Sequence, residues 1–235
     1  MNNKTILIQG AFDTEIEYII NLFQEEKTIE INGYCFFIGS ISNKNVVVSK
    51  TLVGTINTAI ATCIGIINFK PDVVINQGIA GSHVESLHIG DIVIGEKCCN
   101  INSYKMPIKD SGKGSNPFEW KLSKRARDVK YADPNLIRIL HEYINGDSKR
   151  QIIIGTLGSG DVHNREYDRI KWLNNKFGHL CEDMESIGAY SACDKFNVPC
   201  AGIRIISNND LLSKEVNKEI AIELQKKLVN ILGYI

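Results

Sequence analysis

The feature that most restricts the fold is a series of short apolar runs, rich in β-branched residues, that recur along the whole chain. Glycine, proline or polar residues bound each run, and each is shorter than an ordinary helix, a pattern typical of strands buried on both faces. We therefore predict buried strands at residues 4–9, 73–76, 92–96, 152–157 and 199–206.

Segments with helical spacing of apolar residues separate these runs. One of them opens with Asp133 and Pro134, which are favoured at the N-cap and first position of a helix. Helices are predicted at residues 14–24, 55–69, from 134 onward, 167–176, 184–196 and 214–232. Because strands alternate with helices, and no repeat or linker interrupts them, we expect one α/β domain over residues 1–235.

Residues 28–49 predict two or three strands joined by tight turns. Asn32-Gly33 and Ser42-Asn43 are turn signals between β-branched runs, which indicates antiparallel hairpins. An all-parallel sheet is therefore not expected, and the sheet should be mixed.

Residues 101–131 are polar, interrupted by glycine and proline, and carry a basic cluster from Lys121 to Arg127. We expect a long surface loop, a kind of segment that is often functional in a compact domain. The basic cluster is either a solvated face or an anion site.

Composition excludes several classes of protein. Lys+Arg and Asp+Glu both number 27, so a net charge of 0 draws the chain neither to nucleic acid nor to a membrane surface. Seven cysteines, scattered and without metal-ligand spacing, fit a reducing, cytoplasmic setting and no zinc site. We expect no signal peptide and no transmembrane helix, because no apolar run is long enough.

Five polar clusters stand out, four of them at predicted strand ends, where ligands bind in α/β sheets. They read GAFDTE (10–15), GIAG (78–81), SGDVH (159–163), CEDMES (181–186) and SNND (207–210). Each also has a structural explanation. Glu15 fits a first-turn acid, GIAG a tight turn, His163 a satisfied polar residue, and Asp183 with Glu185 a helix cap. The absence of GxGxxG argues against a dinucleotide cofactor.

A role as helix cap does not fully explain Glu185, because it lies at the start of a helix of small, apolar residues that is expected to be buried. A buried carboxylate needs hydrogen-bond donors. A sugar diol supplies two hydroxyl donors, and Met184 beside it offers a soft apolar wall.

GAFDTE, DVVINQGIAGS, HIGDIVI, SGD, the D-M-E triplet and IRIIS follow one another in this order. In this the chain resembles the nucleoside phosphorylase/nucleosidase superfamily, most closely the 5′-methylthioadenosine/S-adenosylhomocysteine nucleosidases. The resemblance covers nearly everything except residues 101–131. It implies a single α/β domain with a mixed, partly barrel-like central sheet flanked by helices, usually a homodimer. It also implies cleavage of an N-glycosidic bond in a purine nucleoside, without metal or organic cofactor.

The resemblance also assigns roles. Met184 and Glu185 would bind ribose, with Glu185 accepting from the 2′- and 3′-hydroxyls, and Glu15 would activate or orient water. The remaining expected substrate contacts are Phe12 at the 5′ substituent, Ala80 and Gly81 at the sugar, Val162, His163 and Asn164 at the base, and Asp183 and Asp210.

The positions of the arginines in the sequence predict which nucleophile, water or phosphate, attacks the sugar. Phosphate is usually held by arginine, whose fork matches it. The first arginine of this chain is Arg125, and Glu15 stands where the related phosphorylases hold phosphate, so water is favoured.

Asn208 departs from the resembled pattern, in which an aspartate after R-x-I-S protonates or hydrogen-bonds the base. An amide cannot deliver a proton as an acid. Asn208 therefore indicates either a 6-oxopurine substrate of the inosine or futalosine type, or an adenine nucleoside whose proton comes from Asp210 or His163. A non-catalytic nucleoside-binding protein is a third hypothesis, against which the presence of both Glu15 and Glu185 argues.

Overall fold

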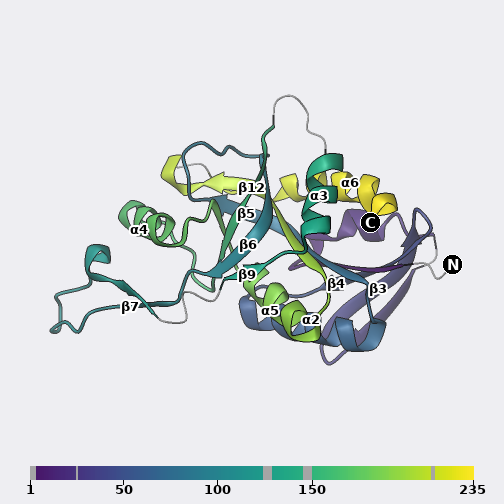
Figure 1. Ribbon diagram of the computed structural model, residues 1–235, viewed down its shortest axis with the longest axis horizontal. Helices are drawn as coiled ribbons and strands as arrows, with labels where there is room; N and C mark the ends of the chain where they lie inside the picture. Colours follow the sequence, from purple (N-terminus) through teal and green to yellow (C-terminus); the bar gives the residue numbers. More distant parts are fainter. Residues whose placement is uncertain (1–3, 25, 124–128, 145–149, 213–214) are drawn as a thin grey trace.

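The computed structural model describes residues 4–24, 26–123, 129–144, 150–212 and 215–235 (Figure 1). Its strands are β1 Thr5–Gly10, β2 Lys27–Ile31, β3 Tyr34–Ile41, β4 Lys44–Lys50, β5 Val73–Ser82, β6 Ile92–Asn100, β7 Tyr104–Lys105, β8 Lys121–Leu122, β9 Lys130–Tyr131, β10 Ile152–Ser159, β11 Cys181–Asp183 and β12 Cys200–Asn209. Its α-helices are α1 Glu17–Ile20, α2 Thr55–Phe69, α3 Pro134–Tyr143, α4 Tyr167–Phe177, α5 Ser186–Phe196 and α6 Ala221–Ile231.

The main sheet is mixed and partly closed, as expected. Its strand order is β11-β10-β6-β12-β5-β1-β4-β3-β2. Strand β5 pairs with β1 over its first half and with β11 at its end, where Cys181 and Glu182 oppose Ser82 and Gly81. The second pairing closes β5, β12, β6, β10 and β11 into a five-stranded barrel-like ring.

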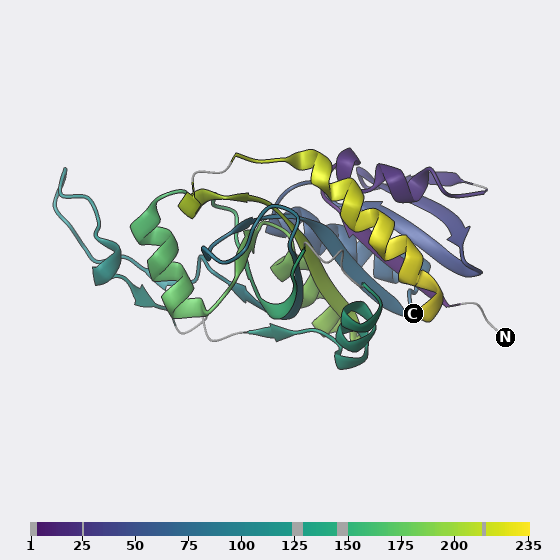
Figure 2. The same ribbon diagram turned by 90° about the horizontal axis from the view of Figure 1, so that it is seen from above.

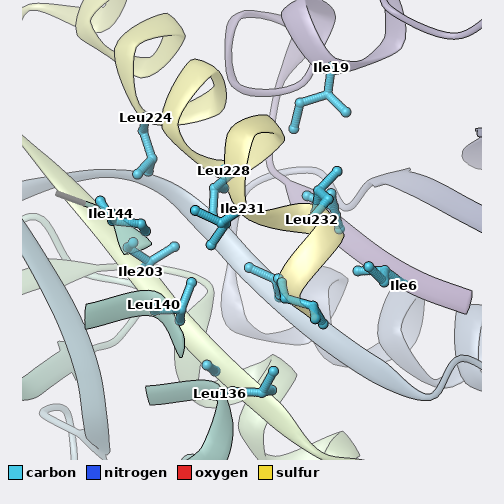
Figure 3. Packing of buried hydrophobic residues seen from close by; sticks show 14 of the residues in the cluster. Ile6, Ile19, Leu136, Leu140, Ile144, Ile203, Leu224, Leu228, Ile231 and Leu232 are labelled. Carbon is cyan, nitrogen blue, oxygen red and sulfur yellow. The ribbon is translucent and has the colours of Figure 1, made fainter. Parts of the chain in front are cut away.

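Two layers of helices cover this sheet. Figure 1 shows α3 and α6 on one side and α2 and α5 on the other. Strand β1 contributes to both cores by simple alternation, because Ile6 and Ile8 pack in one cluster and Leu7 in the other. Figure 3 shows the first cluster, where Leu224 and Leu228 of α6 face the sheet.

The two predicted turns are confirmed. Asn32 and Gly33 have φ of 52° and 84°, and Ser42 and Asn43 have φ of 52° and 59°. These left-handed conformations match the twist of hairpin strands, and β2, β3 and β4 pair antiparallel through them.

Three predicted element boundaries are wrong. The helix predicted over residues 14–24 is reduced to a 3-10 turn, Asp13–Glu15, followed by α1. The helix predicted from Lys214 begins at Ala221, after a 3-10 turn at Lys218–Ile220, and residues 213–214 lie outside the described part. Residues 181–183 of CEDMES form β11, so the helix there starts at Ser186 rather than Met184.

The GIAG segment is also different from the expected tight turn. Strand β5 runs straight through it to Ser82, because β12 pairs with it on one edge and β11 on the other. Residues 78–81 therefore lie within the sheet. Strand β12 pairs with all four, whereas β11 reaches only Gly81 among them, and Ile79 N donates to the Glu15 carboxylate instead.

Residues 101–123 and 129–131 contain three short strands, β7, β8 and β9. Tyr104–Lys105 pairs with Lys121–Leu122, and Lys130–Tyr131 pairs with β6. Figures 1 and 2 show the segment that contains β7 projecting from the body beside α4. Three of the four basic residues of the Lys121 to Arg127 cluster, Lys124, Arg125 and Arg127, lie outside the described residues. None of the helices in the described part of the chain combines the length and apolar character needed to cross a membrane.

Candidate active site

A cavity of about 300 Å³ lies where the ends of β5, β11 and β12 meet the turn after β1. All but two of the residues predicted from the sequence line it: Phe12, Glu15, Ala80, Gly81, His163, Asp183, Met184, Glu185, Asn208 and Asp210. The structure does not bring Val162 or Asn164 into the lining. Val162 is 38% exposed, and the side chain of Asn164 is buried against Glu182.

Glu15 lies against the backbone of β5 at the cavity wall. Its carboxylate accepts hydrogen bonds from Ala11 N (2.6 Å) and Ile79 N (2.9 Å). A Cβ atom on Gly78 would overlap the Glu15 Oε1 atom, so only glycine allows this approach. Burial raises the pKa of Glu15, and the two N–H donors oppose that rise only in part. The raised pKa makes Glu15 a better proton acceptor than a solvent-exposed carboxylate.

The three carboxylates of CEDMES have three different environments. Asp183 caps α5: its Oδ1 accepts from Glu185 N (3.0 Å) and Ser186 N (2.9 Å). Its Oδ2 accepts from Ser186 Oγ and lies 3.0 Å from Nε of the buried Arg204. The oxygens of Asp183 are thus engaged by protein donors. Of the predicted pair only Asp183 binds N–H groups at the start of α5, because the side chain of the N-cap residue Glu185 makes no capping hydrogen bond.

Glu185 has fewer protein partners. It accepts from Gly54 N (3.1 Å), at the start of α2, and from Met184 N (3.2 Å). Burial, reinforced by the nearby charges of Asp183 and Glu15, raises the pKa of Glu185. Its remaining lone pairs are free to accept from a ligand in the cavity.

Glu182 belongs to a polar group that sequence reasoning missed. It accepts from Asn164 N (2.9 Å) and from Asn164 Nδ2, and His83 Nε2 lies 3.4 Å from its Oε2. His83 Nδ1 lies 2.7 Å from His179 Nε2. Glu182 was part of the CEDMES signal, but the histidines lie 99 and 3 positions from it in the sequence, without a local motif.

Burial decides the charge of this group. It lowers the pKa of His83 to about 2 and of His179 to about 3, and it raises the pKa of Glu182 to about 7. Both histidines are therefore neutral at physiological pH.

Asn208 follows an irregularity in β12. The register with β5 shifts between Ile206 and Asn208, which leaves Ser207 as an extra residue and sets Asn208 opposite Gly81. The Asn208 side chain accepts from Ser207 Oγ (2.8 Å) and donates to Asp210 Oδ2 (3.1 Å).

Asp210 connects two further side chains at this edge. Its Oδ2 lies 3.5 Å from His163 Nε2, and its Oδ1 lies 3.3 Å from Arg165 Nε. Asp210 therefore lies between two basic side chains and the amide of Asn208.

Another part of the cavity is apolar. Phe12, Val53 and Val216 line it, and Lys218 Nζ lies 5.6 Å from the Phe12 ring centroid. Sequence reasoning missed Val53, Val216 and Lys218, which stand in segments without a distinctive motif.

Two hydrogen-bonded pairs tie cavity segments that are distant in sequence. Asp161 accepts from Thr55 N (2.7 Å) and Thr55 Oγ1 (2.5 Å), while Glu185 accepts from the neighbouring Gly54 N. In the described residues, no cluster of three or more His, Cys, Asp or Glu side chains could hold a metal ion.

Comparisons with known proteins identify the family of this chain. The family model of the Phosphorylase superfamily matches residues 5–233. A 5′-methylthioadenosine/S-adenosylhomocysteine nucleosidase from Buchnera aphidicola subsp. Acyrthosiphon pisum (strain Tuc7) is 32% identical, over 96% of this chain and 95% of its own. One from Geobacillus sp. (strain WCH70) is 27% identical, over 90% of this chain and 88% of its own.

Solved structures share the fold. The nucleosidase of the same name from Neisseria meningitidis, in complex with methylthio-immucillin-A, superposes with a TM-score of 0.83 at 23% identity, covering 99% of this chain and all of that one. Futalosine hydrolase of Helicobacter pylori strain 26695 gives a TM-score of 0.83 at 24% identity, with 100% of both chains covered.

Proposed function

The chain belongs to the phosphorylase superfamily, and on that premise we propose that it is a purine nucleosidase. It hydrolyses the N-glycosidic bond of 5′-substituted nucleosides such as 5′-methylthioadenosine and S-adenosylhomocysteine. The relatives that carry this activity in their names span nearly the whole chain, which supports treating residues 1–235 as one catalytic unit.

The acidity of the cavity is the observation that carries the choice of water over phosphate. Its lining includes five carboxylates, those of Glu15, Glu182, Asp183, Glu185 and Asp210, against one lysine, Lys218. Arg204 is close by, but it is buried and paired with Asp183. The lining offers a phosphate dianion one lysine, Lys218, as a cationic partner, whereas water both accepts hydrogen bonds and donates them to carboxyl groups.

The proposed reaction is a substitution at the anomeric carbon of the ribose. The bond from C1′ to the base nitrogen breaks, and its electron pair leaves with the base. Water oxygen bonds to C1′, Glu15 takes a water proton, and a proton is taken up by the base. General acid–base assistance of this kind contributes about 10²–10⁴-fold per group, and positioning contributes the rest.

In this proposal, each part of the nucleoside contacts side chains of matching chemistry in the cavity. Glu185 accepts hydrogen bonds from the ribose hydroxyls, beside Met184. His163, Asn208 and Asp210 face the base. The apolar part of the cavity around Phe12 receives the 5′ substituent.

A second candidate is hydrolysis of a 6-oxopurine nucleoside, and Asn208 favours it. Asn208 can donate to a carbonyl oxygen or ring nitrogen but cannot protonate adenine as a carboxylic acid would. For an adenine substrate, Asp210 or His163 would have to supply that proton. The non-catalytic binding hypothesis predicts nucleoside binding without release of base.

The setting of the enzyme is also a proposal. We infer a cytoplasmic enzyme, supported by seven cysteines that are all free, and a role in methionine salvage, supported by the substrates in the names of its relatives. We further infer a homodimer, supported by exposed apolar side chains on the projecting segment, Met106, Ile108 and Phe118. Sedimentation velocity tests the dimer: a monomer at micromolar concentration would contradict it.

Chromatographic detection of released base tests the function. The substrates are 5′-methylthioadenosine, S-adenosylhomocysteine, adenosine, inosine and guanosine, each with and without phosphate. Phosphate-independent adenine release is expected. Release that requires phosphate would overturn the hydrolase assignment, and binding without release would favour the non-catalytic hypothesis.

A further inference from the structure

The group formed by Glu182, His83 and His179 has no part in the hydrolysis just described. Glu182 is 6% exposed, His83 1% and His179 0%, yet Glu182 and His83 line the cavity. Burying three ionisable side chains is costly unless their hydrogen bonds are satisfied. Their arrangement therefore calls for a role at the cavity.

The two histidines share one hydrogen bond whose direction can be deduced. Both are neutral, so only one of the two facing nitrogens carries the proton. If His83 Nδ1 carried it, the bare lone pair of His83 Nε2 would face the Glu182 carboxylate at 3.4 Å. If His179 Nε2 carries it, His83 Nε2 is protonated and donates toward Glu182. The second arrangement is favoured when Glu182 is ionised.

Counting donors around Glu182 leaves one acceptor position open. Oε1 accepts from Asn164 N, while Oε2 accepts from Asn164 Nδ2 and faces the His83 Nε2–H. A carboxylate offers about four lone-pair positions, two on each oxygen. Three are used by the protein, and the fourth belongs to Oε1 of a side chain that lines the cavity.

Glu182 and Asn208 flank a glycine. Gly81 is the register partner of Glu182 in β11 and also of Asn208 in β12. Strand spacing of about 4.8 Å separates Glu182 and Asn208 by about 10 Å across Gly81, and register partners project to the same face of a sheet. A Cβ at Gly81 would lie 3.0 Å from Asn208 Nδ2, so glycine at this position leaves room for the Asn208 amide. The stretch of cavity wall from Glu182 to Asn208, here called the slot, suits the edge of a flat base.

The slot presents one donor and one anionic acceptor. Asn208 uses one amide hydrogen for Asp210 and keeps the second for a ligand. A 6-oxopurine offers the complementary pair on adjacent atoms, the O6 acceptor and the N1–H donor. Adenine offers the reverse, an amino donor beside an N1 lone pair, which an ionised carboxylate would repel.

We propose that Glu182 is a specificity-determining residue that accepts the N1–H of a 6-oxopurine while Asn208 donates to its O6, so that the substrate range includes hypoxanthine or guanine nucleosides. His83 and His179 hold Glu182 in this orientation. The inference rests on the proposed function, because it assumes that a purine base occupies the cavity.

Calorimetric binding of free hypoxanthine and free adenine to the full chain at pH 8 tests the proposal. The wild type should bind hypoxanthine at least as tightly as adenine. Glu182→Gln should lower the hypoxanthine-to-adenine affinity ratio by about 10-fold or more, because hydrogen bonds to charged groups are the stronger class. Glu85→Gln is the matched control, since Glu85 is exposed and paired with Lys171 outside the cavity, and its ratio should equal that of the wild type.

Each other result counts against the proposal. An equal loss of affinity for both bases in Glu182→Gln would leave Glu182 with a structural role only. A wild-type protein that binds adenine but not hypoxanthine would overturn the proposal. This result does not depend on whether any variant folds, and it would leave the proposed nucleosidase function intact. Binding of neither base would overturn the proposal, and the base-release assay would then decide the nucleosidase function separately.

Discussion

Asp183 Oδ2 lies 3.0 Å from Arg204 Nε, and both side chains are only 1% exposed. Arg204 also donates to Asn76 O (2.8 Å) and to Asn76 Oδ1 (2.5 Å), while Asp183 caps α5. The ion pair therefore joins β12, β5 and α5, the helix that begins at Ser186. It holds these three elements together beneath the cavity wall.

Breaking this pair should destabilise the fold. Arg204→Met would leave the Asp183 carboxylate buried without its cation, and loss of one partner of a buried pair costs about 3–5 kcal/mol. Urea unfolding at pH 7 measures the change. Lys195→Met is the control: Lys195 lies 3.9 Å from Asp194 at the surface, and its loss should change the free energy of unfolding by less than about 1 kcal/mol. Equal effects of the two substitutions would contradict the argument.

Glu15→Gln should remove the proton acceptor for water without emptying the cavity. We expect kcat to fall by about 10²–10⁴-fold, with nucleoside affinity changed much less, since the amide keeps the shape of the side chain. Single-turnover kinetics and calorimetry separate the two quantities. Glu17→Gln, an exposed site two positions away, should behave as the wild type. A kcat within tenfold of the wild type in Glu15→Gln would rule out this role.

Glu185→Gln should weaken recognition of the ribose. A charged acceptor for hydroxyl donors is worth about 1.5–3 kcal/mol, so kcat/KM for ribonucleosides should drop about 10–100-fold. The drop should be smaller for 2′-deoxynucleosides, which lack one of the donors. Steady-state kinetics with matched ribo and deoxy substrates provide the comparison, and an identical loss for both would argue against contact with the 2′-hydroxyl.

Asn208→Asp should restore an acid at the base. An aspartate can share a proton with a ring nitrogen of adenine, which an amide cannot deliver. The ratio of kcat/KM for adenine nucleosides over 6-oxopurine nucleosides should therefore rise. Asn175→Asp, exposed on α4, tests for a general effect of added charge. An unchanged ratio in Asn208→Asp would show that this residue does not determine which base the enzyme prefers.

The buried histidines should make the protein sensitive to acid. An unfolded histidine titrates near 6.5, whereas the pKa of His179 in the fold is about 3. Between these values the unfolded chain binds a proton that the folded chain does not, so stability falls as the pH drops below about 6.5 by about 1.4 kcal/mol per pH unit for each such histidine.

His179→Gln should flatten this slope by that amount between pH 6 and pH 4.5, as measured by urea unfolding at several pH values. His141→Gln removes an exposed histidine and serves as the control. Glu182, whose pKa is raised to about 7, contributes the opposite slope between about 4.5 and 7 in both proteins and cancels from the comparison. Parallel slopes for wild type and His179→Gln would refute the assignment.

Much of the fold was predictable because its signals are local. Runs of β-branched residues indicate the buried strands. Asn32-Gly33 and Ser42-Asn43 indicate hairpin turns, because these residues tolerate positive φ. Asp133 was correctly identified as an N-cap, and it accepts from Asn135 N and Leu136 N.

The errors arise where tertiary pairing overrides local preference. Residues 181–183 lack strand propensity, but β10 and β5 supply partners on both sides and make them β11. The GIAG glycines resemble a turn, yet the same closure of the ring keeps them extended. Glu182, His83 and His179 could not be grouped from sequence, because only that closure brings Ser82 beside Cys181, and with them the segments that carry His83 and His179.

The ring closure also determines when the site exists during folding. The cavity takes side chains from Phe12 through Lys218, and its two flanking strands, β11 and β12, come late in the chain. Residues 163–218 supply more than half of the lining, but Phe12 and Glu15 come from the start of the chain, so no fragment shorter than residues 12–218 contains the whole site. Activity should therefore return during refolding only after β12 and the turn that follows it have packed against the rest of the fold. A translation product that ends before them should be inactive rather than partly active.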